Sequence, residues 1–512
     1  MTISRRTFLN GSLALLLCSS SFSEARAKTS FSSYPFRLGV ASGYPRPDSV
    51  VLWTRLAPEP IRVGGGLSPE QLEVKWEVSL DEGFHKVVRS GKKAASPRYA
   101  HSVHVQVAGL RPSTTYYYRF FAGDAVSPVG QTRTAPAPDS LSALSFGFAS
   151  CQMYEQGYFT AHKHMAQEDL DLVLFLGDYI YEHSWGDNLV RKHEGPEVYS
   201  LDQYRSRYAC YKMDADLQAC HARFPWVVTW DDHEVDNDYA NDLAEDLESN
   251  FLSRRAAAYQ AFYEHMPLPE TFAPHNSDMQ IYQALDFGKM ARFHVLDDRQ
   301  YRDHEVCPKP GRGGSNIVAD CPERLDPKRS ILGFKQEEWL TKSLKDSPAA
   351  WDVIVQQTLM AQVVRPGRKF WTDGWDGYPA ARKRLLEAAS KRAGSSTIVV
   401  GGDIHAYAVA DLKIDFDDAQ APVVATEICG TSISSQGPDL KATEGWMQAN
   451  PHIKFFNGTA RGYVTVTLKK EEANIALRAI ETEKKPDANI NTVASFVVER
   501  GKPGAKIGVV QD

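Results

Sequence analysis

Residues able to bind a metal ion or a phosphate follow several short apolar segments of the sequence. The segments and the residues after them are 144–148 with Cys151, 172–176 with Asp178, 226–230 with Asp232 and His233, 291–296 with Arg299, and 398–400 with Asp403 and His405. Each apolar segment reads as a buried β-strand. Because ligands of open α/β sheets bind outside the carboxyl ends of strands, these clusters predict one shared site.

Asp178 is the centre of the first group of candidate ligands. It follows Gly177, which lets the backbone turn sharply, and its two carboxylate oxygens can bridge two metal ions. Tyr181 lies three residues further on and can return to the same place. Free tyrosine titrates near ~10, so a bound phenolate indicates a strongly acidic ion such as ferric iron. Cys151 can add a thiolate, although a core aromatic for Tyr181 and a small buried hydrophobe for Cys151 remain open alternatives.

The second group combines carboxylates with imidazoles. Asp232 offers an oxygen ligand to a second metal, and His233 is expected to lie over the substrate and to stabilise or protonate the leaving oxygen. Glu234 is expected to orient His233, because carboxylates often hold active-site imidazoles. Asp403 and His405 are two residues apart, which on extended backbone places both side chains on one side. Both can therefore reach the metal centre.

Oxygen donors dominate this ligand set. Oxygen sites favour Ca2+, Mg2+ or Mn2+, the phenolate favours Fe3+, and Zn2+ normally takes more His and Cys. Two metals about 3.5–4 Å apart clamp a phosphate and lower the pKa of bound water, which then attacks phosphorus in line. Phosphate also needs positive charge around its oxygens. Arg191 and Arg299 are the candidates, and a surface arginine without a catalytic role is the alternative for each.

Two sequence patterns divide the chain into domains. Residues 36–135 read as all-β, and the run of tyrosines in 110–120 resembles the corner of a fibronectin-III-like β-sandwich. The Pro-Ala-Pro segment 136–138 reads as a linker. Residues 140–485 alternate strands and helices, which predicts an α/β (α+β) catalytic domain with parallel strands. Residues 486–512 are expected to be a C-terminal extension.

The N-terminus has the form of a twin-arginine export signal. Arg5 and Arg6 precede an apolar run at 13–17, and Ala25-Arg26-Ala27 offers a cleavage site, so residues 1–27 are expected to be removed. A chance arginine pair on an ordinary Sec signal is the alternative. The apolar run is too short to span a bilayer. We therefore expect the twin-arginine translocation machinery as a partner and a periplasmic or extracellular location.

Composition excludes some classes of function. The 512 residues carry a formal net charge of -6, which gives no indication of a nucleic-acid binder. The hydrophobic fraction of 43% is ordinary for a globular protein. In an oxidising compartment, Cys307 can pair with Cys321, and Cys210 with Cys220. Oligomeric state does not follow from these features.

Three ordered motifs carry a resemblance to a known family. They are Gly177-Asp178-Tyr179-Ile180-Tyr181-Glu182, Trp230-Asp231-Asp232-His233-Glu234-Val235 and Gly402-Asp403-Ile404-His405-Ala406-Tyr407, and segments 36–43 and 51–55 add to them. Together they resemble the PhoD-type alkaline phosphatase/phosphodiesterase family of the metallophosphoesterase superfamily. The resemblance implies an N-terminal β-sandwich and a metallophosphoesterase core of two sheets flanked by helices (αββα). It also implies iron with calcium, and hydrolysis of phosphomonoesters and phosphodiesters at alkaline pH.

The resemblance also implies roles for single residues. Iron would be held by Cys151, Asp178, Tyr181 and His405, calcium by Asp232 and Asp403, and phosphate by Arg191. The wider superfamily has Asn in place of Asp232 and His in place of Asp403. These departures make the second site more anionic, which suits calcium better than zinc. Whether Asn237 or Asp238 touches metal stays open.

The leading hypothesis is a secreted phosphodiesterase and phosphomonoesterase that scavenges phosphate. A purple acid phosphatase shares the Gly-Asp-x-x-Tyr pattern, but that class uses His where this chain has Asp403. A non-catalytic surface-binding protein is the third hypothesis, and the complete set of candidate ligands weighs against it. The natural substrate stays open among teichoic acids, phospholipid head groups, nucleotides and nucleic-acid ends.

Overall fold

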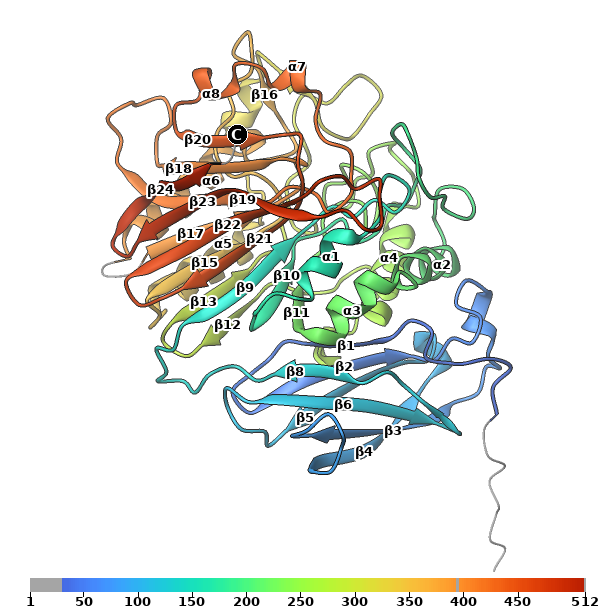
Figure 1. The fold of residues 1–512 in the computed structure, drawn as a ribbon. Helices are drawn as coiled ribbons and strands as arrows, with labels where there is room; N and C mark the ends of the chain where they lie inside the picture. Colours follow the sequence, from blue (N-terminus) through green and yellow to red (C-terminus); the bar gives the residue numbers. More distant parts are fainter. Residues whose placement is uncertain (1–29, 393–395, 511–512) are drawn as a thin grey trace, which may run out of the picture.

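The computed structural model describes residues 30–392 and 396–510. The expected export signal, residues 1–27, lies outside this part of the chain. No helix within the described residues is both long and apolar enough to cross a membrane. Figure 1 shows a small β-domain packed beneath a larger body of stacked sheets, which is the predicted α/β architecture with an N-terminal β-sandwich.

Two large sheets dominate the structure. The ten-stranded sheet runs in the order β24 (Lys502–Val510), β23 (Ile490–Glu499), β22 (Glu472–Ile480), β21 (Arg461–Leu468), β9 (Leu144–Ala149), β10 (Leu172–Phe175), β11 (Pro225–Val228), β1 (Val40–Gly43), β2 (Ser49–Arg55), β5 (Ser102–Ala108). The seven-stranded sheet runs β12 (Gln283–Phe287), β13 (Ala291–Val295), β15 (Trp351–Val355), β17 (Ser396–Gly401), β19 (Val423–Cys429), β18 (Tyr407–Lys413), β20 (Ile453–Asn457).

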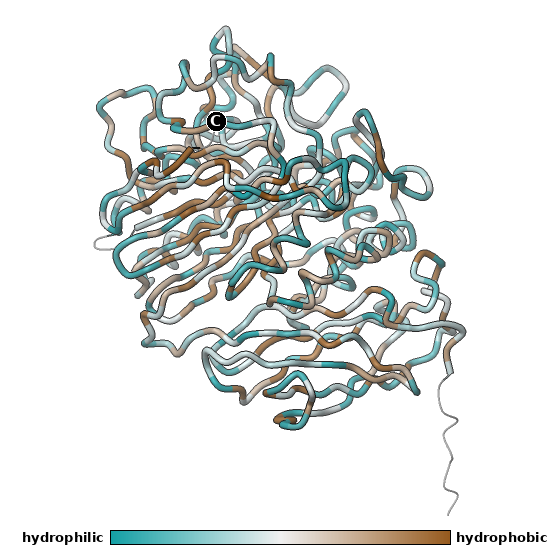
Figure 2. The backbone as a smooth tube through the Cα atoms, viewed as in Figure 1, coloured by the Kyte–Doolittle hydropathy of each residue, from teal (hydrophilic) through white to brown (hydrophobic). Residues whose placement is uncertain are grey.

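Alternation of side chains along the strands builds two apolar layers. Val353 and Val355 of β15 face the ten-stranded sheet and join a core that includes Phe146 of β9, whereas Ile354 between them faces helices. Phe146 meets Phe293 of β13 edge to face, with ring centroids 5.2 Å apart. Apolar residues accordingly follow the strands where the sheets are stacked (Figure 2). A strand buried on both faces reads as a continuous apolar run, which explains the segments seen in the sequence.

Helices flank the stacked sheets. They are α1 (Thr160–Met165), α2 (Leu201–Lys212), α3 (Ala215–Arg223), α4 (Phe251–His265), α5 (Phe334–Lys345), α6 (Pro379–Ser390), α7 (Leu440–Thr443) and α8 (Trp446–Ala449). Local sequence explains where two of them begin. Ser200 and Gln203 form a capping box at the start of α2, and the Asp214 side chain accepts the first amides of α3. The arrangement confirms the predicted αββα sandwich.

The N-terminal domain is a β-sandwich that shares strands with the catalytic body. Its second sheet contains β4 (Val87–Ala95), β3 (Leu72–Ser79), β6 (Thr115–Ala122), β7 (Ala125–Val126) and β8 (Gly130–Arg133), while β14 (Ile317–Val318) and β16 (Phe370–Trp371) form a separate pair. The Tyr116 hydroxyl accepts the Arg111 amide at 2.8 Å, as in the corner expected from the tyrosine run. Because β1 pairs in parallel with β11, hydrogen bonding continues across the expected domain boundary.

The C-terminal residues complete the large sheet. β23 pairs with β22 and β24 pairs with β23, so residues 490–510 extend the catalytic sheet by two strands. The expected boundary at residue 485 therefore falls between two hydrogen-bonded strands. Alternate residues of β22 and β23 are buried, which gives this segment a structural reason to pair.

One of the two disulfides that the sequence allows forms. Cys307 and Cys321 are bonded. Cys210 and Cys220 do not pair, and both thiols are free and buried. Cys210 on α2 lies beside Tyr154, whereas Cys220 on α3 lies near Tyr179, so the two sulfurs have different surroundings.

Candidate metal centre

The candidate ligands lie where the parallel strands end, on unusual backbone. Cys151, Asp178, Asp403 and His405 all have left-handed conformations, with φ of 59°, 55°, 66° and 53°. Such values are uncommon for residues other than glycine and concentrate at functional sites. Gly177 is required here, because a Cβ at this position would lie 2.4 Å from Cβ of Asp231. The backbone thus turns each side chain out of its strand toward one place.

The thiol, phenol and imidazole groups form one side of the site. The Tyr181 hydroxyl donates to Asp178 at 3.0 Å and lies 3.2 Å from Nε2 of His405. Ser435 donates to the same hydroxyl oxygen at 2.8 Å. One ligand atom each from Cys151, Asp178 and His405 lie within 4.8 Å of one another. The structure therefore brings together the four residues predicted to hold iron.

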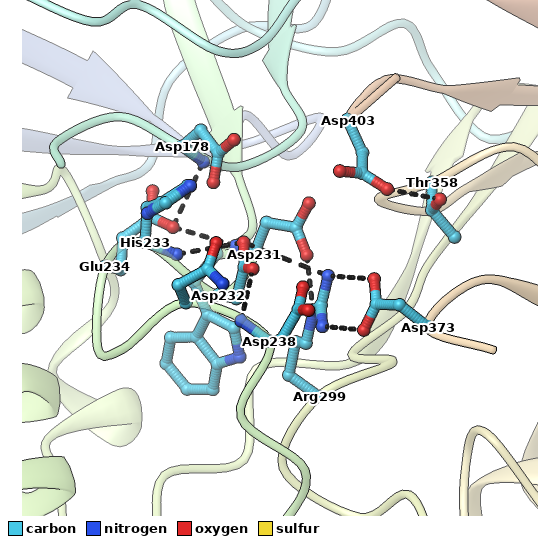
Figure 3. A network of polar contacts seen from close by, with 12 residues as sticks. Asp178, Asp231, Asp232, His233, Glu234, Asp238, Arg299, Thr358, Asp373 and Asp403 are labelled. Atoms are coloured by element: carbon cyan, nitrogen blue, oxygen red, sulfur yellow. Dashed lines mark hydrogen bonds and ion pairs between the residues drawn. The ribbon is translucent and has the colours of Figure 1, made fainter. Parts of the chain in front are cut away.

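Carboxylates form the other side. Ligand atoms of Asp178, Asp232 and His233 also lie within 4.8 Å of one another, so Asp178 belongs to both groups. Asp403 accepts a hydrogen bond from Thr358, and Figure 3 shows its carboxylate facing the space into which Asp178 and Asp231 also point. The predicted calcium ligands Asp232 and Asp403 are therefore on this side of the centre, and Asp178 links the two sides.

Arg299 lies beneath the carboxylates and is 1% exposed. It donates to Asp231 at 2.5 Å and makes two hydrogen bonds, of 2.6 and 2.9 Å, to Asp373. Its guanidinium also lies 3.8 Å from Asp232 (Figure 3). Arg299 is thus at the centre as predicted, but its donors are engaged by carboxylates of the protein. The sequence did not indicate Asp373, because the strand before it, β16, is only two residues long.

Arg191 lies apart from the candidate ligands. It pairs with Asp214 at 2.6 Å, donates to the Tyr154 carbonyl at 2.9 Å and stacks 3.9 Å above the Tyr154 ring. Its Nη2 donates to the carbonyl of Gly157. The hydrogen bonds of its side chain within the described residues therefore go to Asp214 and to two backbone carbonyls, since the loop after Tyr181 carries it toward α1 and α3.

His233 is held by a carboxylate that the sequence did not indicate. Its Nδ1 lies 2.7 Å from Glu182, which leaves Nε2 free of that contact. The expected partner, Glu234, instead accepts the backbone amides of Asp178, Tyr179 and Asp231 at 3.1, 2.6 and 2.8 Å. The expectation that Glu234 orients His233 is wrong, because Glu234 braces the Asp178 turn.

Asn237 and Asp238 differ in their contacts. The Asn237 side chain donates to Glu245 at 2.9 Å. The amide of Asp238 donates to Asp232 at 2.7 Å, and its carboxylate accepts from Ser315 and appears beside Arg299 in Figure 3. Asp238 thus belongs to the carboxylate cluster, and Asn237 does not.

The charge balance of the centre calls for cations. Burial raises the pKa of Asp178 to about 7, and burial with nearby acids raises the pKa of Asp238 to about 7. Burial also raises the pKa of Asp403 well above its usual value. Oδ1 of Asp178 and Oδ2 of Asp231 are buried without a hydrogen-bond partner among the described residues. Crowded, unsatisfied carboxylates of this kind fit bound metal ions, which supply the missing charge.

The pKa values of the histidines, the thiol and the phenol of the centre are also shifted by burial and by nearby charges. Burial lowers the pKa of His233, but Glu182, Asp232 and Asp178 outweigh this and raise it well above its usual value. Burial lowers the pKa of His405 to about 3, so this imidazole is neutral and able to bind a metal. Burial raises the pKa of Cys151 and of Tyr181, so each needs a cation to become an anionic ligand.

Comparison with known sequences identifies the family. The family model described as PhoD-like phosphatase matches residues 146–477, and the model of its N-terminal domain matches residues 21–136. The chain belongs to the PhoD-like phosphatase family. The chain is also similar to alkaline phosphatase D of Bacillus subtilis (strain 168), with 45% identity over 527 residues that cover 99% of this chain and 89% of the relative. The sequence resemblance is thereby confirmed.

Solved structures agree with this assignment. A structure of PhoD superposes with a TM-score of 0.90 at 45% identity and covers 94% of each chain. The purple acid phosphatase PPD1 from seeds of yellow lupin (Lupinus luteus) gives a TM-score of 0.58 at 14% identity, covering 91% of this chain and 75% of the lupin chain. The second likeness concerns the fold alone. Membership of the PhoD-like phosphatase family makes this a metal-dependent phosphoesterase, in agreement with the candidate ligand groups.

Proposed function

We propose that this chain hydrolyses phosphomonoesters and phosphodiesters at the centre built around Asp178. The observation that carries the proposal is that Asp178 belongs to two groups of candidate metal ligands at once. A carboxylate with two oxygens suits a site in which two cations share one ligand. The family relationship to alkaline phosphatase D supports the same reaction.

The two sides of the centre suit different ions. Fe3+ would be held by Cys151, Asp178, Tyr181 and His405, whose thiolate and phenolate favour a strongly acidic ion. Ca2+ would be held by Asp178, Asp232 and Asp403, which offer only oxygen. Mn2+, Mg2+ and Zn2+ fit less well. When bound, these ions would supply the Lewis acidity that activates water and polarises the phosphate.

His233 would supply a proton to the leaving oxygen. Glu182 holds Nδ1 at 2.7 Å, so Nε2 is the nitrogen left to face the substrate. The surrounding carboxylates raise the pKa of His233, which keeps the imidazole charged and able to donate. Because Glu182 is fully buried and also accepts the Asn237 amide, the orientation of His233 is fixed before substrate binds.

The two arginines predicted to bind phosphate differ in their contacts. Arg299 holds Asp231 and Asp373, which favours a role in positioning the carboxylates over a direct phosphate contact. Arg191 would need to leave Asp214 and the Tyr154 ring before it could reach substrate. We therefore propose that the cations at the centre carry most of the phosphate recognition.

We also propose that the protein is exported and releases phosphate for scavenging. The twin-arginine motif of residues 1–27 supports export in a folded state. The bond between Cys307 and Cys321 supports an oxidising compartment such as the periplasm or the exterior, where structural disulfides persist.

Metal analysis combined with an assay tests the function. The purified protein would be stripped of metal, reloaded with Fe3+ and Ca2+ or with Zn2+ or Mn2+, and assayed on a monoester and a diester across pH. We expect iron with calcium to restore activity on both esters at alkaline pH. Full activity of the exhaustively stripped protein would refute the metal mechanism. A null rate with both ions bound would favour the non-catalytic hypothesis, and a zinc or manganese requirement would favour the purple acid phosphatase type.

A further inference from the structure

A tryptophan that the metal centre does not account for lies beside two of its ligands. Trp185 follows Tyr181 by four residues, on the loop after β10. Its ring is nearly parallel to the His405 ring, with an interplanar angle of 10° and centroids 6.0 Å apart, and lies 6.1 Å from the Tyr181 ring. Trp185 is only half-buried. It therefore presents an aromatic surface at the rim of the centre.

The position of Trp185 is fixed by contacts between two glutamines. The Gln156 side chain donates to the Trp185 carbonyl at 2.8 Å and accepts the Gln436 amide at 2.6 Å. The carbonyl of Gln436 lies 2.7 Å from Nδ1 of His405. Gly186 permits this approach, because its φ is 84° and a Cβ there would lie 2.2 Å from Nε2 of Gln156. The same contacts thus set both Trp185 and His405 before substrate arrives.

The indole N–H of Trp185 differs from those of three tryptophans in the core. Trp230, Trp351 and Trp375 each donate their indole N–H to a partner, at 3.1, 2.8 and 3.0 Å. The Nε1 atom of Trp185 is buried yet has no partner among the described residues, and the same holds for the core residue Trp446. Buried tryptophans usually find a partner for this group. Trp185 differs from Trp446 in being half-buried beside two candidate metal ligands.

We infer that Trp185 selects the organic group of the substrate by stacking on a planar ring carried by the ester. The inference rests on the proposed phosphoesterase function. A phosphate bound at the metal centre would lie next to Tyr181 and His405, and its ester group would then lie beside the indole, since Trp185 contacts both residues. Stacking on an indole accepts any flat ring, so the class of substrate is an aryl or nucleoside phosphate ester rather than an ester of a small polyol.

Substrate pairs that differ only in the ring test this role. The metal-loaded protein and its W185A and W185F variants would be assayed on p-nitrophenyl phosphate and on glycerol phosphate. We expect W185A to lower kcat/KM for the aryl ester by about tenfold, within the range of alanine substitutions at stacking aromatics, and for glycerol phosphate by less than about twofold. W185F should retain most of the aryl preference. L189A, an exposed apolar residue of the same loop, is the matched control and should change neither rate.

A second test does not depend on turnover. It measures the binding of phenylphosphonate and of methylphosphonate by calorimetry. Wild-type protein should bind phenylphosphonate more tightly, and W185A should bind the two about equally. Equal losses on both substrates together with loss of iron would show that Trp185 only supports His405, and an unchanged preference in W185A would also overturn the inference. A wild-type protein that binds both phosphonates but hydrolyses neither ester would instead refute the proposed function and leave the ring preference measurable.

Discussion

The two sides of the metal centre are held in place by different forces. On the thiol, phenol and imidazole side, Tyr181 and His405 are positioned by neutral partners, the Ser435 hydroxyl and the Gln436 carbonyl. On the carboxylate side, Asp231 and Asp373 are positioned by the buried charge of Arg299. The first side is ordered by hydrogen bonds to neutral groups, and its buried thiol and phenol become anionic only with a bound cation. The second gathers more negative charge than its arginine neutralises, so it depends on a bound cation.

Removing the ligand shared by both sides should have the largest effect. D178N keeps the size of the side chain but loses the charge that both groups of ligands use. We expect activity to fall about a thousandfold or more, because removing one charge-stabilising group already costs about 10²–10³ in rate. The measurement is phosphodiester hydrolysis by metal-loaded protein, with metal content and circular dichroism recorded alongside.

Asp187 provides the control for this substitution. It lies exposed on the loop after Tyr181, and its side chain is not part of the centre. D187N should therefore retain activity. If D178N turned over substrate at the wild-type rate, Asp178 would not bridge the two sides, and the contrast between them would lose its basis.

Removing the buried arginine of the carboxylate side should lower the free energy of unfolding more than removing a neutral partner on the other side. R299M leaves Asp231 and Asp373 without their partner in a site that excludes water. Breaking a buried ion pair typically costs about 3–5 kcal/mol, so we expect the free energy of unfolding to fall by that order. Urea denaturation measures it. S435A, which removes a neutral partner of Tyr181, should cost only about 1 kcal/mol, and equal losses from both variants would contradict the distinction.

After metal removal, the stability of the protein should depend on pH because of buried acids on the carboxylate side. Burial raises the pKa of Glu234 to about 8 and that of Asp238 to about 7, from usual values near 4. In this window the folded, metal-free protein binds more protons than the unfolded chain, so its stability falls as pH rises from about 4 to about 8. We expect a decrease of several kcal/mol in metal-free protein, because each of the two pKa values lies about three units above its usual value. Calcium-loaded protein should show a flatter profile, and matching profiles would show that cations do not balance these charges.

The parts of the centre that sequence could predict are those that follow apolar strands. Cys151, Asp178, Asp232, Asp403 and His405 each come soon after such a strand, and the strand ends bring them together. Residues whose place depends on tertiary contacts were missed. Asp373 follows only a two-residue strand, and Glu182 reaches His233 over a separation of 51 residues. The αββα fold was predictable for the same reason, since a strand buried on both faces is recognisable from its composition.

The same limit applies to the strand pairing at the two ends of the chain. The β1–β11 pair joins the β-sandwich to the catalytic sheet through only two pairs of residues, Ser42 with Pro225 and Gly43 with Trp226. No local sequence pattern predicts a pairing between strands so far apart in the chain. Residues 490–510 were expected to be an extension, although alternate residues of β23 are buried against the sheet. Period-two patterns indicate a strand without indicating its neighbour.

The smallest effect on catalysis is expected at Arg191, which the sequence predicted to bind phosphate. Its guanidinium is held by Asp214 and stacked on Tyr154, so R191A should lower the free energy of unfolding by about 1–2 kcal/mol through lost packing and a lost ion pair. The value of kcat/KM should change less than about threefold, because the loss of a distant contact leaves the transition state unaffected. R62A, which removes an exposed arginine that forms an ion pair with Glu59, gives the baseline. A fall in kcat/KM of about a hundredfold with unchanged stability would instead mean that Arg191 leaves Asp214 to bind phosphate during turnover.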